Sequence, residues 1–264
     1  HPADGDSSPD ASPDADGDSS PHANQDPHTH AQSHSYALGE TMRVIAGSAK
    51  GYHLKGPRRA GVRPTTDLVR GALFSLLEAM GADFSRVLDL YAGTGSLGIE
   101  ALSRGTGWCD FVERDPAACA VIRHNLSVTH LAERATVHRM PVERAPAALQ
   151  GPYTLILLDP PFDDPGALVL LQELVRSSLA DPDTIIAIEH SRRQEAPGSL
   201  LPGPPGPGLP RRGIALPVWA AFTAVARRRY GDSCLTIYGQ ESPSNTQEGE
   251  EHAESREQAG QGVK

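Results

Sequence analysis

Strand-like and helix-like stretches alternate regularly between residues 86 and 190. Short apolar runs typical of buried strands occupy 86–91, 109–113, 135–139, 153–159 and 184–190. The segments between them predict helices ending near Arg104 and over 116–128, 142–149 and 166–179. This alternation predicts an α/β fold with a mostly parallel sheet, because the crossover helices must cover both of its faces. Two later runs, 219–231 and 233–239, predict an antiparallel pair at one edge.

The segments outside this pattern set the domain limits. Residues 42–80 predict a small hairpin followed by an amphipathic helix, so we expect one domain over 42–239. Residues 1–41, rich in Asp, Ser, Pro and His, and residues 240–264, rich in Glu and Gln, predict disordered acidic tails because they can bury little. The Pro- and Gly-rich stretch 196–213 predicts a surface loop.

The net charge of −9 is distributed unevenly. Segment 43–70 holds seven Lys or Arg residues against the single acid Asp67. Such a segment can bind nucleic-acid phosphates, although it can equally be a solvated face. The sequence has no apolar run of membrane-spanning length, no pattern of a secretory signal and no cysteine spacing typical of metal sites. We therefore expect a cytoplasmic protein without a membrane span or a metal.

A glycine-rich turn follows the first strand of the predicted sheet. Gly93, Gly95 and Gly98 form G-x-G-x-x-G between a strand and a helix, which allows a tight turn and the close approach of a ligand. The motif alone fits a dinucleotide or S-adenosylmethionine. Asp89 would repel a pyrophosphate but attract the ammonium group of S-adenosylmethionine, and Glu113 can accept hydrogen bonds from ribose hydroxyls. Taken singly, Asp89 also fits a helix-cap or loop hydrogen bond, and Glu113 a solvated strand end.

The fourth predicted strand ends in Asp159-Pro160-Pro161-Phe162. Ligands of parallel sheets bind outside the carboxyl ends of the strands, where this motif stands. Asp159 can accept an N–H of the exocyclic amine of a base and so increase the nucleophilicity of its nitrogen. The prolines can present carbonyl groups in a rigid turn, and Phe162 offers a face on which a base can stack. The motif indicates methyl transfer to a base amine; the simpler alternative is a Pro-Pro turn with Phe162 in the core.

Several stretches together resemble one family. They are MRVIAGSAKGYHLK (42–55), RPTTDLVRGALFSLL (63–77), DLYAGTGSLGIEALSRG (89–105), VERD (112–115) and LLDPPF (157–162). Over residues 42–239 the chain is similar to the RsmD-type methyltransferases, which methylate a guanine N2 in bacterial small-subunit ribosomal RNA. The resemblance implies a Rossmann-like class I methyltransferase fold with seven strands, the last antiparallel. It also implies S-adenosylmethionine as cofactor and the assembled ribosomal subunit as substrate.

The resemblance further implies roles for individual residues. The target guanine would be held by Asp159, Pro160, Pro161 and Phe162. The cofactor would be bound by Asp89, Gly93, Gly95 and Glu113. Because Arg139-Met140-Pro141 supplies no acid for the adenine amine, we also expect backbone and apolar contacts from Met140 and Pro141. Further candidate cofactor residues are Tyr91, Ala92 and Arg114. The mouth of the active site, where substrate binds, would be formed by Arg63, Thr65, Thr66 and Arg70. From the residues alone, Thr65, Thr66 or Asp67 could simply cap the helix that follows.

Two departures from the family pattern and three rival functions accompany this interpretation. Ser75 stands where the family commonly has Asn, and the 196–213 insert is unusually long.

Methylation of another base amine, such as adenine N6 in RNA or DNA, would use the same chemistry. A nicotinamide-dependent oxidoreductase shares the glycine motif but lacks an obvious catalytic pair here. A non-catalytic RNA-binding protein could use the basic segment. We expect a monomeric rRNA (guanine-N2)-methyltransferase.

Overall fold

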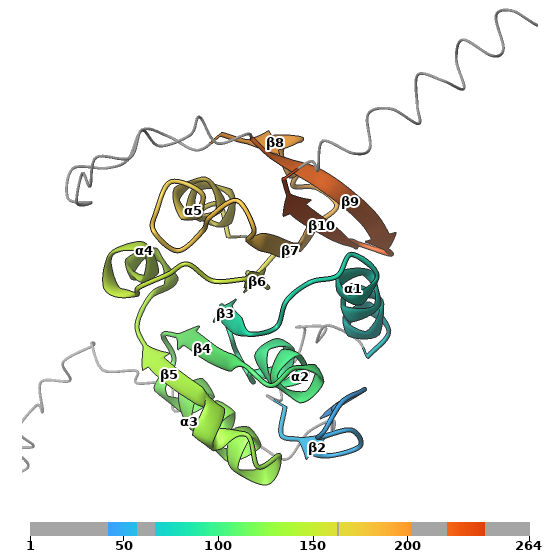
Figure 1. The fold of residues 1–264 in the computed structure, drawn as a ribbon, viewed down its shortest axis with the longest axis vertical. Coiled ribbons are helices and arrows are strands. Elements are labelled where there is room, and N and C mark those ends of the chain that lie inside the picture. The colour runs from blue at the N-terminus through green and yellow to red at the C-terminus, as the bar shows by residue number, and fades with distance from the viewer. Residues whose placement is uncertain (1–41, 57–66, 163, 202–220, 241–264) are drawn as a thin grey trace, which may run out of the picture. The chain divides into compact units, whose positions relative to one another are not determined.

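The computed structural model describes residues 42–56, 67–162, 164–201 and 221–240. Their main feature is an eight-stranded sheet with the order β5-β4-β3-β6-β7-β10-β9-β8 (Figure 1). In chain order its strands are β3 (Arg86–Leu90), β4 (Trp108–Glu113), β5 (Ala135–Arg139), β6 (Leu155–Leu158), β7 (Ile185–Ser191), β8 (Ser199–Leu200), β9 (Phe222–Tyr230) and β10 (Ser233–Gly239). The predicted tails, most of the 196–213 insert, and Arg63, Thr65 and Thr66 lie outside the described residues.

The sheet confirms the parallel arrangement predicted from the alternating pattern. Strands β5, β4, β3, β6 and β7 are all parallel. Strand β10 lies between β7 and β9 and is antiparallel to both, so the predicted antiparallel pair is also present. Because the chain proceeds outward from β3 to β5 and then returns to β6 on the other side of β3, the strand order reverses beside β3. In open α/β sheets this reversal opens a crevice at the carboxyl ends of the strands.

Within the described ranges, five α-helices cover the two faces of the sheet. They are α1 (Asp67–Ala79), α2 (Ser96–Arg104), α3 (Pro116–Val128), α4 (Ala145–Ala148) and α5 (Ala167–Leu174), with short 3-10 turns η1 (Ala132–Arg134) and η2 (Val142–Arg144). Helices α4 and α5 lie across the sheet from α1 and α2 (Figure 1). Leu155 and Leu157 of β6 belong to the core cluster that contains α1, α2 and α3, whereas Ile156 and Leu158 belong to the cluster with α4 and α5. Burial on both faces explains the uninterrupted apolar run of β6.

Two sequence-based boundaries differ from the structure. The helix predicted over 166–179 ends at Leu174, and further turns occupy the following residues. The predicted surface loop 196–213 begins with strand β8, so the sheet has eight strands and not seven. Leu200 of β8 pairs with Phe222 of β9, and its side chain is fully buried in the α5 cluster. A two-residue strand is too short to show a periodicity. The Pro- and Gly-rich composition of the segment therefore predicted only a loop.

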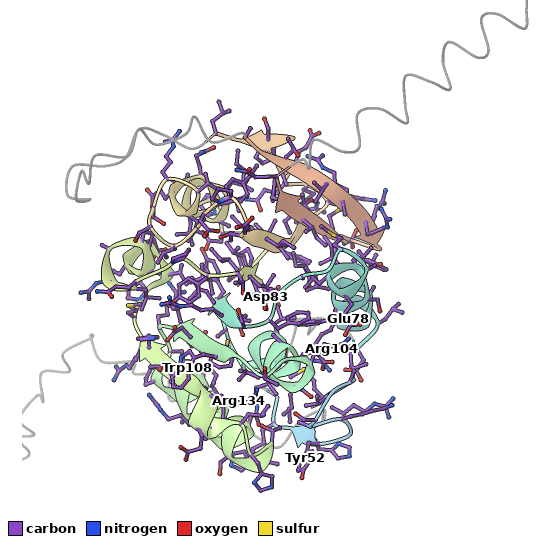
Figure 2. All side chains as sticks on the ribbon, in the orientation of Figure 1. Tyr52, Glu78, Asp83, Arg104, Trp108 and Arg134 are labelled. Carbon is purple, nitrogen blue, oxygen red and sulfur yellow. The ribbon has the colours of Figure 1, made fainter. Side chains whose placement is uncertain are left out.

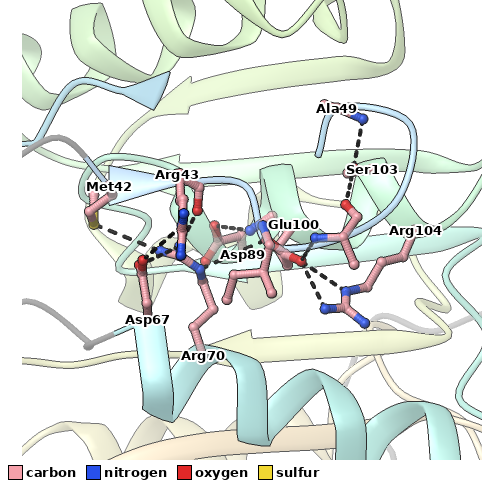
Figure 3. A network of polar contacts seen from close by, with 12 residues as sticks. Met42, Arg43, Ala49, Asp67, Arg70, Asp89, Glu100, Ser103 and Arg104 are labelled. Atoms are coloured by element: carbon pink, nitrogen blue, oxygen red, sulfur yellow. Dashed lines mark hydrogen bonds and ion pairs between the residues drawn. The ribbon is translucent and has the colours of Figure 1, made fainter. Parts of the chain in front are cut away.

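The predicted N-terminal hairpin consists of β1 (Met42–Arg43) and β2 (His53–Leu54). Strands this short need external support. The buried carboxylate of Glu100 on α2 accepts hydrogen bonds from the backbone N–H groups of Ile45 at 2.8 Å and Ala46 at 3.0 Å. The Ser103 hydroxyl, one turn further along α2, accepts from the Ala49 N–H at 2.9 Å and donates to the Ala46 carbonyl (Figure 3). Helix α2 therefore holds the hairpin in place.

The same Glu100 carboxylate neutralises two arginines. The Arg104 Nη2 lies 2.9 Å from Glu100 Oε1, and the Arg70 Nε lies 3.9 Å from Glu100 Oε2 (Figure 3). Arg70 also donates to Asp67 at 2.9 Å, and Arg104 contacts Glu78 between α1 and α2 (Figure 2). Burial lowers the pKa of the Arg70 guanidinium, and the charges of Asp67 and Glu100 oppose that shift.

The predicted position of Arg70 at the mouth of the active site is therefore wrong. Its side chain is fully buried and joins α1 to the hairpin, where it also donates to the Arg43 carbonyl. The acid that compensates this buried charge, Glu100, lies far away in the sequence, so the pairing leaves no local signal.

Replacing Glu100 with Gln should lower the free energy of unfolding by about 3–5 kcal/mol, because it leaves two largely buried guanidinium groups without their shared carboxylate. Urea denaturation measures the change. The matched control is Glu78→Gln at the half-exposed end of the same network, which should cost less than about 1 kcal/mol. Equal small losses in both variants would show that the buried charge network contributes little.

Candidate functional site

The carboxyl ends of three neighbouring strands bring the predicted acids together. Asp89 lies in β3, Glu113 ends β4, and Asp159 follows β6. The Asp159 N–H approaches the Leu90 carbonyl of β3 at 3.5 Å, and the Met140 N–H after β5 donates to the Glu113 carbonyl at 3.1 Å. These backbone contacts place the glycine turn, Glu113, Met140 and the Asp-Pro-Pro-Phe motif along one edge of the sheet.

The glycine turn depends on backbone conformations that favour glycine. Gly93 and Gly95 have φ values of 54° and 77°. Tyr91 also has a positive φ of 58°, an uncommon conformation for a bulky residue and one that clusters at functional sites. The Glu113 carboxylate accepts hydrogen bonds from the Gly93 N–H at 2.9 Å and from the Asp115 N–H at 2.8 Å. Glu113 therefore lies directly against the turn.

The third glycine of the motif has a different function. Gly98 lies inside α2, and a Cβ atom there would collide with the Phe111 ring and the Cys109 sulfur of β4. Its absence of a side chain lets α2 pack closely on the sheet. Gly98 thus contributes to the site by positioning the helix that begins at the glycine turn.

Asp89 is almost completely buried at 1% exposure. Its carboxylate accepts a hydrogen bond at 2.9 Å from the N–H of Gly98 in the first turn of α2, so the helix-cap type of bond considered as an alternative is present. Burial raises the pKa of the Asp89 carboxyl well above its usual value, and the charges of Asp159 and Glu113 raise it further. The site thus concentrates negative charge, while direct contact of Asp89 with a ligand remains a prediction.

The Asp-Pro-Pro-Phe motif opens outward from the sheet. Pro160 is buried and Asp159 half-buried, whereas Pro161 is exposed and Phe162 is 41% exposed. The alternative with Phe162 in the core is therefore wrong. Phe162 borders an open cleft of about 440 Å³ whose other lining residues are Pro165, Ser191, Arg192, Arg193, Gln194 and Asp232. The motif thus presents an aromatic face to a space that a ligand can enter.

The remaining predicted cofactor residues differ in burial. Ala92 is buried, and Met140 is half-buried against the cluster that contains α4 and α5. Arg114 and Pro141 are exposed. Burial and the neighbouring Asp164 raise the pKa of Tyr91. Contact of these residues with a cofactor stays a prediction.

Two features of the site escaped the sequence analysis. Asn125 of α3 donates from its side-chain amide to the Thr94 carbonyl in the glycine turn at 3.0 Å. The same side chain accepts from the Lys55 N–H at 2.8 Å and donates to the Lys55 carbonyl at 3.0 Å, which joins the hairpin to the turn. The second feature is the pair Arg192 and Arg193. They directly follow β7, and ligands of parallel sheets bind outside the carboxyl ends of the strands. The same rule that singled out Asp159 could therefore have found them.

Comparison with known proteins shows the family. Residues 42–201 match the family model described as conserved hypothetical protein 95. The chain is 40% identical over 162 residues to YlbH of Bacillus subtilis, a match that covers 60% of this chain and 88% of YlbH. It is 37% identical over 121 residues to ribosomal RNA small subunit methyltransferase D of Escherichia coli, covering 46% of this chain and 60% of that protein. The chain belongs to the RsmD-type methyltransferase family.

Solved structures agree with this assignment. The Escherichia coli protein YhhF has a TM-score of 0.60 and 26% identity, and the match covers 77% of this chain and 99% of that one. A conserved hypothetical protein of Streptococcus pyogenes has a TM-score of 0.54 and 30% identity, with coverage of 66% and 96%. The RsmD-type fold is thus the Rossmann-like class I methyltransferase fold that the resemblance implied.

The described residues contain neither a membrane-spanning helix nor a cluster of metal-binding side chains. In the described ranges, no helix has the length and apolar character needed to cross a lipid bilayer. Across the same residues, no three His, Cys, Asp or Glu side chains are grouped so that they could hold a metal ion.

Asp89→Asn should stabilise the protein more at about pH 8 than at about pH 5, because the raised pKa means that the fold prefers the neutral carboxyl. In the wild type, the neutral Asp89 carboxyl contributes its full share of the folding free energy below about pH 3.9, the pKa of this group in the unfolded chain. That contribution is lost as the pH rises through the higher pKa of Asp89 in the folded protein. Asparagine keeps an oxygen that can accept from Gly98 but carries no charge.

Urea denaturation at the two pH values measures this effect. Asp232→Asn is the control, because the Asp232 side chain is 79% exposed. A change in unfolding free energy that is identical at both pH values would contradict a raised pKa at Asp89.

Proposed function

We propose that this RsmD-type protein transfers a methyl group from S-adenosylmethionine to the exocyclic N2 of a guanine in small-subunit (16S) ribosomal RNA. The substrate is the assembled subunit, and the protein acts as a monomer in the cytoplasm, where that subunit occurs. The names of relatives support the substrate class, since those from Escherichia coli and Haemophilus influenzae are called ribosomal RNA small subunit methyltransferase D. The geometry of the carboxyl edge supports the reaction.

The charge of the site favours S-adenosylmethionine over a dinucleotide. Asp159 and Glu113 are close enough to Asp89 for their charges to raise its pKa. A site with this negative potential attracts the ammonium and sulfonium groups of S-adenosylmethionine and repels a pyrophosphate. When bound, this cofactor supplies an electrophilic methyl group.

The residues around the glycine turn fit the parts of this cofactor. Glu113 would accept hydrogen bonds from the ribose hydroxyls, and the Gly93 and Gly95 backbone would allow the close approach of the ligand. Met140 and Pro141 would contact the adenine, while Tyr91, Ala92 and Arg114 would complete the surroundings. Asp89 accepts a hydrogen bond from the Gly98 N–H with one oxygen, and its second oxygen would accept from the ammonium group.

The Asp-Pro-Pro-Phe motif would hold the acceptor. A guanine stacked on the exposed Phe162 can donate an N2 hydrogen to Asp159, while the carbonyl groups of Pro160 and Pro161 provide further acceptors. The hydrogen bond to Asp159 draws electron density onto the nitrogen, and stacking fixes its direction of attack. The protein thus contributes orientation and a proton acceptor, without covalent catalysis.

The observation that carries the proposal is the adjacency of Asp159 and the glycine turn across β6 and β3. The proposal also includes the substrate contacts that the resemblance implies, made by Arg63, Thr65 and Thr66. The catalytic domain would span 42–239, with the two tails outside it. The direct test is transfer of a labelled methyl group to small subunits that lack the modification, followed by nucleoside mass spectrometry. N2-methylguanosine is the expected product, and N6-methyladenosine would redirect the proposal to another base.

Asp159→Ala should reduce methyl transfer about 100-fold or more, because the amine loses its proton acceptor. The affinity for S-adenosylhomocysteine, measured by calorimetry, should remain nearly unchanged. The matched control is Asp183→Ala, which removes an exposed acid before β7, at the opposite edge of the sheet. Loss of cofactor affinity together with transfer would indicate that Asp159 supports the fold of the site.

A further inference from the structure

A short turn after β7 presents two arginines beside the Asp-Pro-Pro-Phe motif. The Gln194 N–H donates to the Ser191 carbonyl at 3.0 Å, and the Arg193 N–H lies 3.2 Å from the Ser191 hydroxyl oxygen. The Arg192 N–H donates to the Asp232 carbonyl in the β9–β10 turn at 2.9 Å. The backbone that carries Arg192 and Arg193 is therefore fixed by hydrogen bonds on both sides.

Side chains attach this turn to its surroundings. The Gln194 amide donates to the Asp164 carbonyl at 3.1 Å, two residues beyond Phe162. His190 is buried, and its Nδ1 lies 2.8 Å from the Gln194 carbonyl, so this nitrogen is the donor. The His190 Nε2 then accepts from the Thr236 hydroxyl at 2.9 Å. The turn is thus anchored to β10 and to the loop that holds Phe162.

The two guanidinium groups themselves are weakly engaged. Arg192, Arg193 and Phe162 line the same open cleft of about 440 Å³. The Arg192 side chain is 52% exposed, and its Nε lies 3.9 Å from an Asp232 carboxylate that is 79% exposed. Such an exposed pair contributes little and can be exchanged for another anion. In the part of the chain that the structure describes, Arg193 is exposed and makes no ion pair with a carboxylate.

We propose that Arg192 and Arg193 bind the phosphates that flank the nucleotide whose base stacks on Phe162. This inference rests on the proposed function, since it assigns a binding site to the phosphates of the same RNA whose base is methylated. A base drawn onto Phe162 brings its own backbone to the rim of the cleft, where the guanidinium forks can bind phosphate oxygens in pairs. The exposed Arg229, whose Nε donates to the Gly231 carbonyl beside Asp232, extends the basic surface.

The position of the pair explains why a rigid turn would be useful. Phosphate contacts set the register of a nucleic acid, and base contacts select the nucleotide. Because Gln194 connects the arginine turn to the Asp164 loop, a phosphate held by Arg192 and Arg193 keeps a fixed distance from Phe162. Arg192 and Arg193 are therefore positioning residues, which act on binding and not on the methyl transfer itself.

The test compares three variants in binding to small subunits that lack the modification. In the double variant Arg192→Gln and Arg193→Gln, affinity and KM should each worsen about tenfold or more, and the slope of log affinity against log salt should fall by about 0.7 per lost phosphate contact. The double variant with Lys at both positions should recover much of the affinity, because Lys also binds phosphate as a point charge. The control Arg123→Gln changes an exposed arginine on α3 and should bind like wild type.

The value of kcat at saturating substrate and the affinity for S-adenosylhomocysteine should stay within about twofold of wild type in all variants. Wild-type binding and salt slope in the glutamine double variant would overturn the inference. A wild-type protein that binds subunits but forms no N2-methylguanosine would refute the proposed function alone, since the binding comparison still decides the role of the arginines. A wild-type protein that binds no subunits would overturn both.

Discussion

The pairing of β3 with both β4 and β6 is the constraint on which the site depends. It places Asp89 beside Phe111 on one side and Leu157 on the other, so the ends of all three strands meet. In sheets of this kind, crossovers on either side of the first strand leave a crevice at the carboxyl ends, and the glycine turn and the Asp-Pro-Pro-Phe motif both stand at those ends. A cofactor bound at the turn and a base held by the motif would then share one space, which is the geometric requirement of direct methyl transfer.

The N-terminal hairpin is attached to the same crevice through polar side chains of the helices. Glu100 and Ser103 bind its backbone from α2, and Asn125 joins Lys55 to the Thr94 carbonyl of the glycine turn. The hairpin thus belongs to the supporting structure of the turn. The buried carboxylate of Glu100 compensates Arg70 and Arg104 as well, so one acid joins α1, α2 and the hairpin.

Local signals predicted much of this structure. Helix α3 begins and ends as expected, because Asp115 caps it by accepting from the Ala117 N–H and Pro116 favours the first turn. The apolar runs predicted the buried strands. The position of Asp159 directly after such a run predicted a site at the carboxyl ends of the strands. Features that depend on distant partners were missed. Arg70 resembles a surface residue until Glu100 is placed beside it, and β8 exists only because β9 pairs with it.

The central claim is that one crevice holds the cofactor at the glycine turn and the acceptor at Asp159. A crystal structure with S-adenosylhomocysteine tests it most directly. The account predicts the ribose hydroxyls at Glu113, the amino group on the side of Asp89, and the sulfur facing Asp159 and Phe162. Binding of the ligand away from the glycine turn, or with its sulfur directed away from Asp159, would contradict it.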